Sequence, residues 1–504
     1  MARKSKSVAE FGDFQTPPDL ALGATRLLKA SGIKPGAIVE PTCGRGSFLS
    51  AAMQVFPKVR RFVGVEINRQ YLKAAEECVS GLANRQCAEL HHEDFFDADW
   101  DSILQNLPEP IVILGNPPWV TSSELGSLAS DNLPEKSNFK GHKGLDAVTG
   151  KSNFDISEWM ILRYLDWLGN RSGTIAVLCK SAVARKILAY AWKQNRPVAG
   201  ASVYQIDAGK HFGAAVDACL FVLRVGRDGG EKECRVFASL NASEPEYIIG
   251  FRNGILVTNV EAYERRARLL AKGPDTYVWR SGIKHDCSKV MEFAFYGDQL
   301  KNGFNELVAL EDDLLFPLLK SSDVGNGRTT PRRAMLVTQR RIGEATNSLS
   351  ARAPRCWEYL MRHADALNAR TSVIYRGKPP FSIFGVGDYS FSPWKIAISG
   401  FYKKLEFSRI GPVGGRPVVF DDTIYFLPCW SEQEATFLWR LLNSHAAREF
   451  LESMISWSEK RPITTELLKR LSIRQLAEDA GASHEYEQFA QPAGTLFSHS
   501  VRAA

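Results

Sequence analysis

The first half of the chain alternates short apolar runs with helical stretches, and this alternation restricts the fold more than any other feature of the sequence. The runs expected to form strands are AIVE from Ala37, FVGVE from Phe62, IVIL from Ile111, TIAVL from Thr174 and ACLFVLRV from Ala218. Between them, SFLSAAMQVF from Ser47 and ISEWMILRYLDWL from Ile156 have the apolar spacing of helices. Such alternation predicts an α/β domain in which crossover helices join the strands of a parallel sheet.

The sequence changes character after residue 225. A chain of 504 residues is too long for a single core, and the glycine-rich, charged segment VGRDGGEKECRV (225–236) predicts a domain boundary. Beyond it glycine, proline and aromatic residues are frequent, and a helical period returns only in EQEATFLWRLLNSHAAREFLESMISW, from Glu432. We therefore expect a first domain over 1–235 and a loop-rich α+β domain over 236–504.

Composition excludes several classes of protein. The chain is 44% hydrophobic and 24% charged, as in ordinary globular proteins, and it contains no run of 18 apolar residues that could span a membrane. Its basic N-terminus lacks the apolar segment of a secretory signal. The nine cysteines show no CxxC spacing, which argues against structural zinc and a disulfide framework and fits a reducing cytoplasm.

A glycine turn follows the first expected strand, in IVEPTCGRGSFL (38–49). Gly44 and Gly46 would let the backbone approach a ligand at the carboxyl edge of the sheet, although turns in general also use glycine. Glu40 leads into this turn. A carboxylate there is unsuited to a phosphate but suited to a ligand that carries an amino group.

Two further acids follow later strands. Glu66 ends the second strand, where α/β nucleotide folds bind ribose hydroxyls, and a plain surface carboxylate is the alternative. Asp94 and Phe95 precede the strand at Ile111; the acid could bind the amine of an adenine while the ring packs on its face. Together these residues predict a pocket for an adenosine with a cationic, amino-acid-like tail, which describes S-adenosylmethionine.

The strand at Ile111 ends in Asn116-Pro117-Pro118-Trp119. Taken alone, this tetrapeptide is equally typical of an ordinary turn, since Asn-Pro starts turns and two prolines cannot continue a strand. Its meaning depends on the motifs around it.

In combination, these motifs resemble the γ-class amino-methyltransferases of DNA, in particular the TaqI-like and Eco57I-like adenine methyltransferases. That family has, in order, a Q-T-P motif, a (D/E)-P-x-x-G-x-G-x-F-L motif, N-P-P-(Y/F/W) and a target-recognition domain. Here FGDFQTPPDLA (11–21), EPTCGRGSFL (40–49) and NPPW (116–119) match in that order. LLFPLLKSSDV (314–324) and EKRPITTELLKRL (459–471) resemble the recognition region more loosely.

The resemblance implies a class I S-adenosylmethionine-dependent, Rossmann-like methyltransferase domain followed by an α+β recognition domain. It implies a cofactor pocket formed by Thr16, Glu40, Pro41, Cys43, Gly44, Gly46, Glu66, Asp94 and Phe95. The rigid Asn116–Trp119 turn would carry the chemistry: the Asn116 amide oxygen and the Pro117 carbonyl accept hydrogen bonds from the target amine, Pro118 helps to fix the turn, and Trp119 stacks on the base. Phe212, in AGKHFGAAVDACLF, is the candidate for the opposite face of the base, and a core phenylalanine is the alternative.

The implied function is site-specific methylation of adenine N6 in duplex DNA, with the base flipped out of the helix. The expected role is DNA modification in a prokaryotic restriction-modification or phage-defence system, by a cytoplasmic protein that is associated with the nucleoid. A separate restriction endonuclease or defence subunit is a candidate partner. We expect the chain to methylate but not to cut DNA, because the Q-T-P motif begins near Phe11 and leaves no room for a preceding nuclease, and the second half lacks an acidic-lysine constellation. No metal is expected. The alternatives are an RNA adenine or another amine as substrate, or a non-catalytic module that binds S-adenosylmethionine and nucleic acid.

An arginine-rich stretch in the second half is the candidate DNA contact. GNGRTTPRRAMLVTQRR (325–341) contains no acid, within a chain of net charge +7. Arginine suits both phosphate and guanine edges, although a solvated loop is the alternative. The candidate DNA-binding residues are Arg328, Arg332, Arg333, Arg340 and Arg341.

Overall fold

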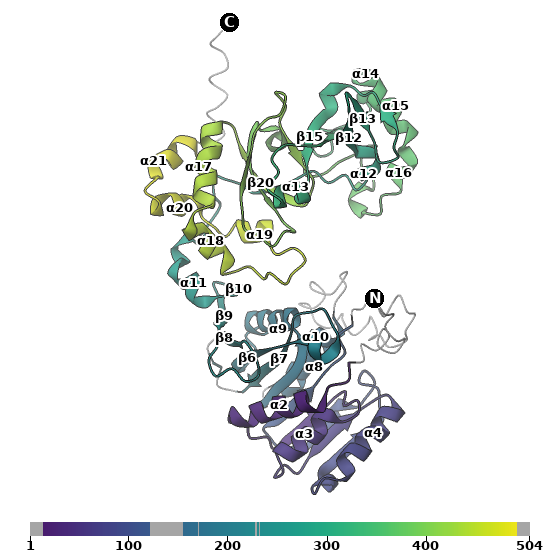
Figure 1. Ribbon diagram of the computed structural model, residues 1–504, viewed down its shortest axis with the longest axis vertical. Coiled ribbons are helices and arrows are strands. Elements are labelled where there is room, and N and C mark those ends of the chain that lie inside the picture. The colour runs from purple at the N-terminus through teal and green to yellow at the C-terminus, as the bar shows by residue number, and fades with distance from the viewer. Residues whose placement is uncertain (1–13, 121–154, 170, 227–228, 231, 491–504) are drawn as a thin grey trace. The chain divides into compact units, whose positions relative to one another are not determined.

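The computed structural model describes residues 14–120, 155–169, 171–226, 229–230 and 232–490. Phe11, at the start of the Q-T-P motif, and parts of the expected boundary segment lie outside these residues. The chain divides into two compact units, Met1–Val260 and Glu261–Ala504 (Figure 1). We describe each unit by itself.

The first unit is built on a ten-stranded sheet in the order β10-β9-β8-β6-β7-β5-β4-β1-β2-β3. Strands β1 to β5 are parallel to one another, and β7 is antiparallel to both of its neighbours, β5 and β6. The strands are β1 Ala37–Glu40, β2 Phe62–Val65, β3 Ala88–His91, β4 Ile111–Gly115, β5 Gly173–Lys180, β6 Val198–Ile206, β7 Ala218–Val225, β8 Glu233–Phe237, β9 Tyr247–Arg252 and β10 Ile255–Val257. All five strands expected from the sequence are present.

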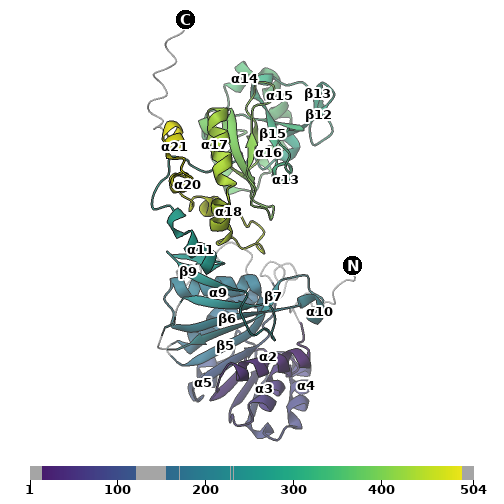
Figure 2. The same ribbon diagram turned by 60° about the vertical axis from the view of Figure 1, so that its left-hand side comes forward.

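Helices cover both faces of this sheet, because its central strands are apolar on both sides. On one face α2 and α3 pack on alternate residues of β1 and β4, such as Ile38 and Val112; Figure 2 shows α2, α3 and α4 together on this side. On the other face α5, α8 and α9 pack on Val39 and Ile113. The helices are α2 Pro18–Ala30, α3 Ser47–Val55, α4 Arg69–Ser80, α5 Trp100–Gln105, α8 Ile156–Leu168, α9 Ser181–Lys193 and α10 Ala208–Phe212.

The first unit extends further along the chain than the expected boundary at residue 235. Strand β8 pairs in parallel with β6, β9 pairs with β8, and β10 pairs with β9. These strands satisfy their backbone hydrogen bonds on the edge of the first sheet, so residues 236–260 belong to the first unit rather than to the second. The glycine-rich segment therefore connects β7 to β8, two strands of the same sheet, and does not separate the two units.

The second unit combines two mainly antiparallel sheets with short helices, as expected for an α+β domain. One sheet has the order β11-β20-β17-β18 and the other β14-β13-β12-β16-β15-β19. Their strands are β11 Arg280–Ser281, β12 Glu292–Tyr296, β13 Gln299–Lys301, β14 Leu307–Val308, β15 Leu315–Leu319, β16 Arg333–Leu336, β17 Trp394–Ser399, β18 Ser408–Ile410, β19 Val419–Phe420 and β20 Ile424–Cys429.

The helical stretch expected from Glu432 forms two helices, because Ser444 caps a new helix after Asn443. The helices of this part of the chain are α11 Val260–Arg265, α12 Ser288–Met291, α13 Ser321–Gly325, α14 Leu349–Arg352, α15 Pro354–Arg362, α16 Ala364–Asn368, α17 Glu432–Leu442, α18 His445–Glu452, α19 Thr465–Leu468, α20 Ile473–Asp479 and α21 Ser483–Phe489.

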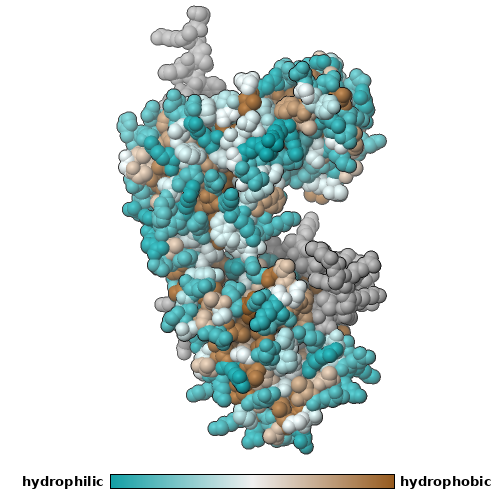
Figure 3. Space-filling model, viewed as in Figure 1, coloured by the Kyte–Doolittle hydropathy of each residue, from teal (hydrophilic) through white to brown (hydrophobic). Residues whose placement is uncertain are grey.

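The helices show no membrane span: within the described ranges, none is long and apolar enough to cross a bilayer. On the face drawn in Figure 3, hydrophilic residues predominate and apolar residues are interspersed among them.

Candidate functional site

A cavity of about 370 Å³ opens at the carboxyl ends of β1, β2 and β4. Strand β1 lies between β2 and β4, so the connections from its end diverge to opposite sides, and α/β sheets bind ligands at such a point. The volume lies within the range of roughly 300–1,000 Å³ that is usual for small-molecule sites. The lining residues are Phe14, Gln15, Thr16, Glu40, Pro41, Thr42, Cys43, Gly44, Arg45, Ser47, Val65, Glu66, Ile67, Asn68, Tyr71, Glu93, Asp94, Phe95, Phe96, Asn116, Pro118 and Met160.

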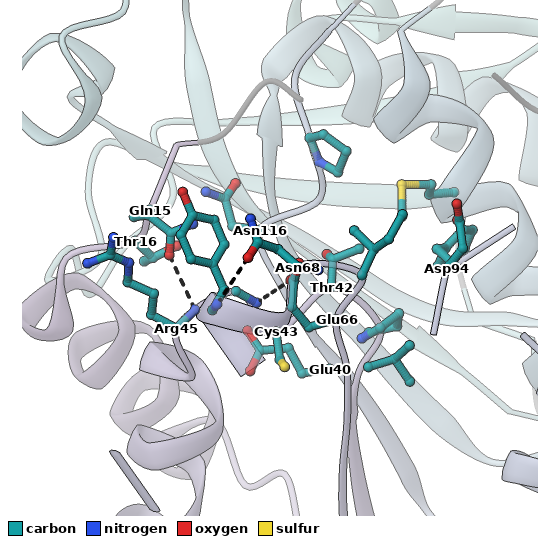
Figure 4. A pocket seen from close by; sticks show the side chains of 18 of the residues that line it. Gln15, Thr16, Glu40, Thr42, Cys43, Arg45, Glu66, Asn68, Asp94 and Asn116 are labelled. Atoms are coloured by element: carbon teal, nitrogen blue, oxygen red, sulfur yellow. Dashed lines mark hydrogen bonds between the residues drawn. The ribbon is translucent and has the colours of Figure 1, made fainter. Parts of the chain in front are cut away.

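Most residues expected at the site meet in this cavity. All the expected cofactor residues line it except Gly46, as do Asn116 and Pro118 of the turn. Figure 4 shows Thr16 and Arg45 toward one end and Asp94 at the other, with Glu66 between them. The cavity is therefore elongated, with acidic groups distributed along its length.

Glu66 is held in place by the backbone around it. Its Oε2 accepts a hydrogen bond from the Gly44 N–H at 2.8 Å, and its Oε1 accepts one from the Asn68 N–H at 2.8 Å. These two bonds connect the glycine turn after β1 to the start of α4. A carboxylate can accept more than two hydrogen bonds, so ligand hydroxyls can bind to it without displacing these N–H groups.

Glu40 is buried at the end of β1, with only 3% of the residue exposed. Its Oε2 has no hydrogen-bond partner among the described residues. Burial raises the pKa of this carboxyl well above its usual value, and the negative charge of Glu66 raises it further. A buried, unsatisfied carboxylate oxygen is costly, and a cationic group in the cavity would compensate for that cost.

The two glycines of the turn differ in what they do. Both have positive φ, +53° at Gly44 and +81° at Gly46. Gly44 faces the cavity, whereas a Cβ on Gly46 would lie 3.0 Å from the Cα and Cβ of Ala75 in α4. Gly46 therefore allows α3 and α4 to pack closely, and it does not line the cavity.

Asp94 and Phe95 follow β3 and line the cavity, and Asp94 lies at the end opposite Thr16 (Figure 4). The Phe96 N–H donates to Asp94 Oδ1 at 2.9 Å, and burial raises the pKa of Asp94. Phe95 is buried and packs edge-on against Trp159. The Asp94 carboxylate is thus fixed beside buried and partly buried aromatic side chains.

Asn116, directly after β4, has a side-chain amide whose orientation is fixed. Its Nδ2 donates to the main-chain oxygen of Phe14 at 2.8 Å, while its buried Oδ1 has no hydrogen-bond partner among the described residues. The same side chain lines the cavity. The site therefore contains a buried acceptor that no described residue satisfies, adjoining the space in which a ligand can bind.

The remaining residues of the expected chemistry lie beside the cavity rather than on its wall. Trp119 is 5% exposed, and its ring centroid lies 5.1 Å from that of Phe212 and 5.6 Å from that of Phe14. Phe212, the last residue of α10, also packs edge-on against Phe14. These three rings form an aromatic cluster next to Asn116. Pro117 is buried within the turn.

Several lining residues were not expected from the sequence. Arg45 lies between the two glycines and its guanidinium stacks over the ring of Tyr71, 5.0 Å from the centroid. Asn68 caps α4 two residues after Glu66. These positions could have been inferred from their neighbours in the motifs. Met160 could not, because it enters from α8, far along the chain.

The five candidate arginines of the second unit lie around β16. Three form ion pairs with acids outside the run: Arg328 with Asp323, Arg333 with Glu292 at 3.7 Å, and Arg341 with Asp388 at 3.2 Å. The Arg340 guanidinium lies over the Phe391 ring, 4.5 Å from its centroid. Arg332 is exposed, and its side chain has no ion pair or hydrogen bond to the described residues. The run is therefore less uniformly available to an anion than its sequence indicates.

Within the described part of the chain, no group of three or more His, Cys, Asp or Glu side chains is arranged to hold a metal ion.

Comparison with known proteins yields one curated relative of nearly equal length. The chain is 45% identical over 473 residues to the Type II methyltransferase M.NspV of Nostoc sp. (strain ATCC 29411 / PCC 7524), covering 94% of this chain and 98% of that protein. No family model matches the sequence.

Among solved structures, the chain is similar to the Type IIL restriction-modification enzyme MmeI in complex with DNA. The TM-score is 0.52 at 14% identity, over 90% of this chain and 64% of that one. The chain thus spans slightly less than two thirds of that structure's length, and at this identity the similarity concerns the fold.

Proposed function

The chain belongs to the Type II methyltransferases, and on this basis we propose that it methylates the N6 amine of an adenine flipped out of duplex DNA. The fold is a class I S-adenosylmethionine-dependent methyltransferase domain followed by an additional domain, and the cofactor is S-adenosylmethionine. The finer assignment, adenine rather than cytosine and DNA rather than RNA, is the proposal.

The cavity suits this cofactor. Glu40 offers an unsatisfied buried carboxylate oxygen for the α-amino group, and Glu66 offers a fixed carboxylate for the ribose hydroxyls. Asp94, beside Phe95, would bind the adenine amine. The cofactor supplies a methyl group on a positively charged sulfur, which a neutral amine can attack.

The observation that carries the proposal is the buried Oδ1 of Asn116, which adjoins the cavity and has no donor within the described part of the chain. The exocyclic amine of a base supplies the missing N–H. A base amine is a weak nucleophile because its lone pair is delocalised into the ring. Two acceptors on its two hydrogens, Asn116 Oδ1 and the Pro117 carbonyl, favour the pyramidal geometry in which the lone pair points at the methyl group.

The residues around the turn would hold the two acceptors, Asn116 Oδ1 and the Pro117 carbonyl, in place before the substrate binds. The Phe14 carbonyl accepts from Asn116 Nδ2, so the oxygen of the amide is directed to the substrate rather than away from it. Pro117 and Pro118 restrict the backbone of the turn. Preorganisation of this kind lowers the barrier, because no reorientation is needed at the moment of reaction.

The target base would stack within the aromatic cluster of Phe14, Trp119 and Phe212. The 5.1 Å separation and 71° angle between the Trp119 and Phe212 rings describe an edge-on contact. A base held between two parallel faces needs a spacing of about 7 Å, twice the stacking distance, so Phe212 would move to admit it. Base flipping delivers the target from the duplex.

We assign DNA binding to the second unit, with Arg332 as its most available arginine, and modification within a restriction-modification system as the role. A cognate endonuclease and a cytoplasmic location belong to the same proposal. The family relationship and the basic stretch around β16 support it.

Replacement of Asn116 by Ala tests the proposal. The variant should lose at least about a hundredfold in methyl transfer, the scale for removing one preorganised hydrogen bond to the reacting group. S-adenosylmethionine affinity should change little, because Asn116 acts on the amine. Transfer of tritium from labelled cofactor to unmethylated plasmid DNA measures the rate, with RNA and protein as parallel acceptors, and calorimetry measures the affinity.

Asn84→Ala is the matched control. Its Nδ2 also donates to a main-chain oxygen, that of Met53, but it lies away from the cavity. Near-normal transfer by the Asn116 variant, or equal loss in both variants, would contradict the assigned role. Transfer to RNA or protein in place of DNA would reject the proposed substrate.

A further inference from the structure

The Asn116–Trp119 turn must be held by groups outside itself. Pro117 and Pro118 have no backbone N–H, and among the described residues the Trp119 N–H does not donate to the Asn116 carbonyl, so the hydrogen bond that closes an ordinary turn does not hold this segment. Asn116 is anchored through its side chain to Phe14. The other end of the turn, at Trp119, needs its own anchor.

Strand β5 supplies that anchor through two residues. Trp119 Nε1 donates to the main-chain oxygen of Leu178 at 3.2 Å, and Lys180 Nζ donates to the main-chain oxygen of Trp119 at 3.2 Å. Leu178 and Lys180 are two residues apart on β5, which lies next to β4. Both the ring and the carbonyl of Trp119 are thus attached to one strand.

Lys180 is itself held by a buried acid. Its Nζ lies 2.6 Å from Asp155 Oδ2, and Asp155 is 7% exposed. The other oxygen, Asp155 Oδ1, accepts the Ser157 N–H at 3.0 Å and so caps α8. A lysine pinned in this way loses little further conformational entropy when it holds the turn.

We propose that Lys180 is a positioning residue for methyl transfer, whose ammonium group, oriented by Asp155, fixes the Trp119 carbonyl and thereby the placement of the acceptors at Asn116 and Pro117. The inference rests on the proposed function of that turn. Lys180 and Asp155 do not line the cofactor cavity, so their effect should fall on the transfer step and not on cofactor binding.

The chain offers a closely matched control. Lys186, which lies on α9 six residues after Lys180, forms an ion pair of 2.8 Å with the buried Glu158 of α8. This second pair joins α9 to α8, and the Lys186 ammonium group has no hydrogen bond to the turn among the described residues. Replacement of Lys186 therefore measures what the loss of a lysine–carboxylate pair at this place does to the structure, without any effect on the position of the turn.

The test compares K180M, K180R and K186M in steady-state and single-turnover transfer from labelled S-adenosylmethionine to unmethylated plasmid DNA. K180M should lower kcat by about tenfold to a hundredfold, since a displacement of about 1 Å can cost that much. Its KM and calorimetric Kd for the cofactor should stay within about twofold. K180R, which keeps the charge and the donors, should recover most of the rate, and K186M should retain normal kcat.

The inference is overturned if K180M transfers methyl groups at the normal rate, if K186M loses as much, or if K180M loses cofactor affinity in parallel with rate. If K180M does not fold, the same measurements are made on Asp155→Asn. A lower kcat with an unchanged cofactor Kd supports the positioning role of Lys180, and an unchanged kcat rejects it. The ratio of variant to wild-type rate tests Lys180, whereas the identity of the methylated base tests the proposed function, so the two can fail separately.

Discussion

At the scale of single residues, the site is defined by two buried oxygens that lack donors among the described residues: Oε2 of Glu40 and Oδ1 of Asn116. Glu40 is the last residue of β1 and Asn116 directly follows the neighbouring strand β4; a Cβ on Gly115 would already lie 3.3 Å from Glu40 Cγ. Both residues could be inferred from the sequence, because polar side chains at the carboxyl ends of parallel strands converge. The carbonyl of Phe14 that orients Asn116 could not, since a main-chain contact across a hundred residues leaves no trace in residue type.

Glu40 should make cofactor binding depend on pH. Burial raises its pKa in the free protein, and a cationic amino group beside it would lower that pKa in the complex. Between the two values binding releases a proton, so affinity should fall as pH decreases, by up to about tenfold per pH unit for one proton. Calorimetric titration with S-adenosylmethionine from pH 8 downward measures this.

Glu40→Gln is the control for that titration, because it keeps the shape and removes the charge while leaving the ionisation of Asp94 and of the cofactor in place. The variant should bind more weakly at high pH and show a flatter pH profile. Identical profiles for variant and wild type would mean that Glu40 does not face the amino group.

At the scale of elements, apolar runs in the sequence identified the central strands of the first sheet well and its edge strands poorly. Strands β1, β4 and β5 are buried on both faces and read as continuous apolar runs. Strand β3, AELH, lies at the sheet edge and is half polar, so it gives little pattern. The pairing of β8 with β6 is a long-range choice that no local pattern encodes, and for this reason the first unit extends past the expected boundary.

The arginine stretch shows the same limit. Its freedom from acids was read from the sequence, but Glu292 lies on a neighbouring strand and pairs with Arg333 across the sheet. Only folding brings these charges together. A contact that is already satisfied within the protein gains less from a phosphate, so the five arginines should not contribute equally.

Arg332→Ala should therefore have the clearest effect on DNA binding. Its guanidinium has no ion pair to the described residues, so a phosphate contact there would displace about one counterion and steepen the salt dependence by about one unit. Gel-shift titration of a random-sequence duplex at several salt concentrations measures both affinity and slope. Cofactor affinity should be unchanged, because all lining residues of the cavity lie in the first unit.

Arg362→Ala serves as the comparison, since Arg362 is an exposed arginine of α15 that pairs with Glu358 outside the run. Equal salt slopes for wild type and the Arg332 variant would show that the stretch around β16 is a solvated loop.

At the scale of the whole molecule, the chain has two compact units, and the candidate site lies in the first of them. The cavity, the Asn116 amide oxygen and the aromatic cluster of Phe14, Trp119 and Phe212 all lie within Met1–Val260. This part could be largely derived from sequence because its chemistry sits in short motifs at strand ends. The second unit has ion-paired arginines and two small sheets, but base recognition depends on a few side chains at base edges, and their placement cannot be read from residue type.

The central claim is that the protein methylates the N6 amine of adenine in DNA while the Asn116–Trp119 turn holds that amine. Its most direct test is to incubate unmethylated duplex DNA with the protein and S-adenosylmethionine, digest the product to nucleosides, and identify the modified base by mass spectrometry. The account predicts N6-methyladenine, absent when Asn116 is replaced by Ala. Methylation of cytosine, or label in RNA or protein but not in DNA, would contradict it.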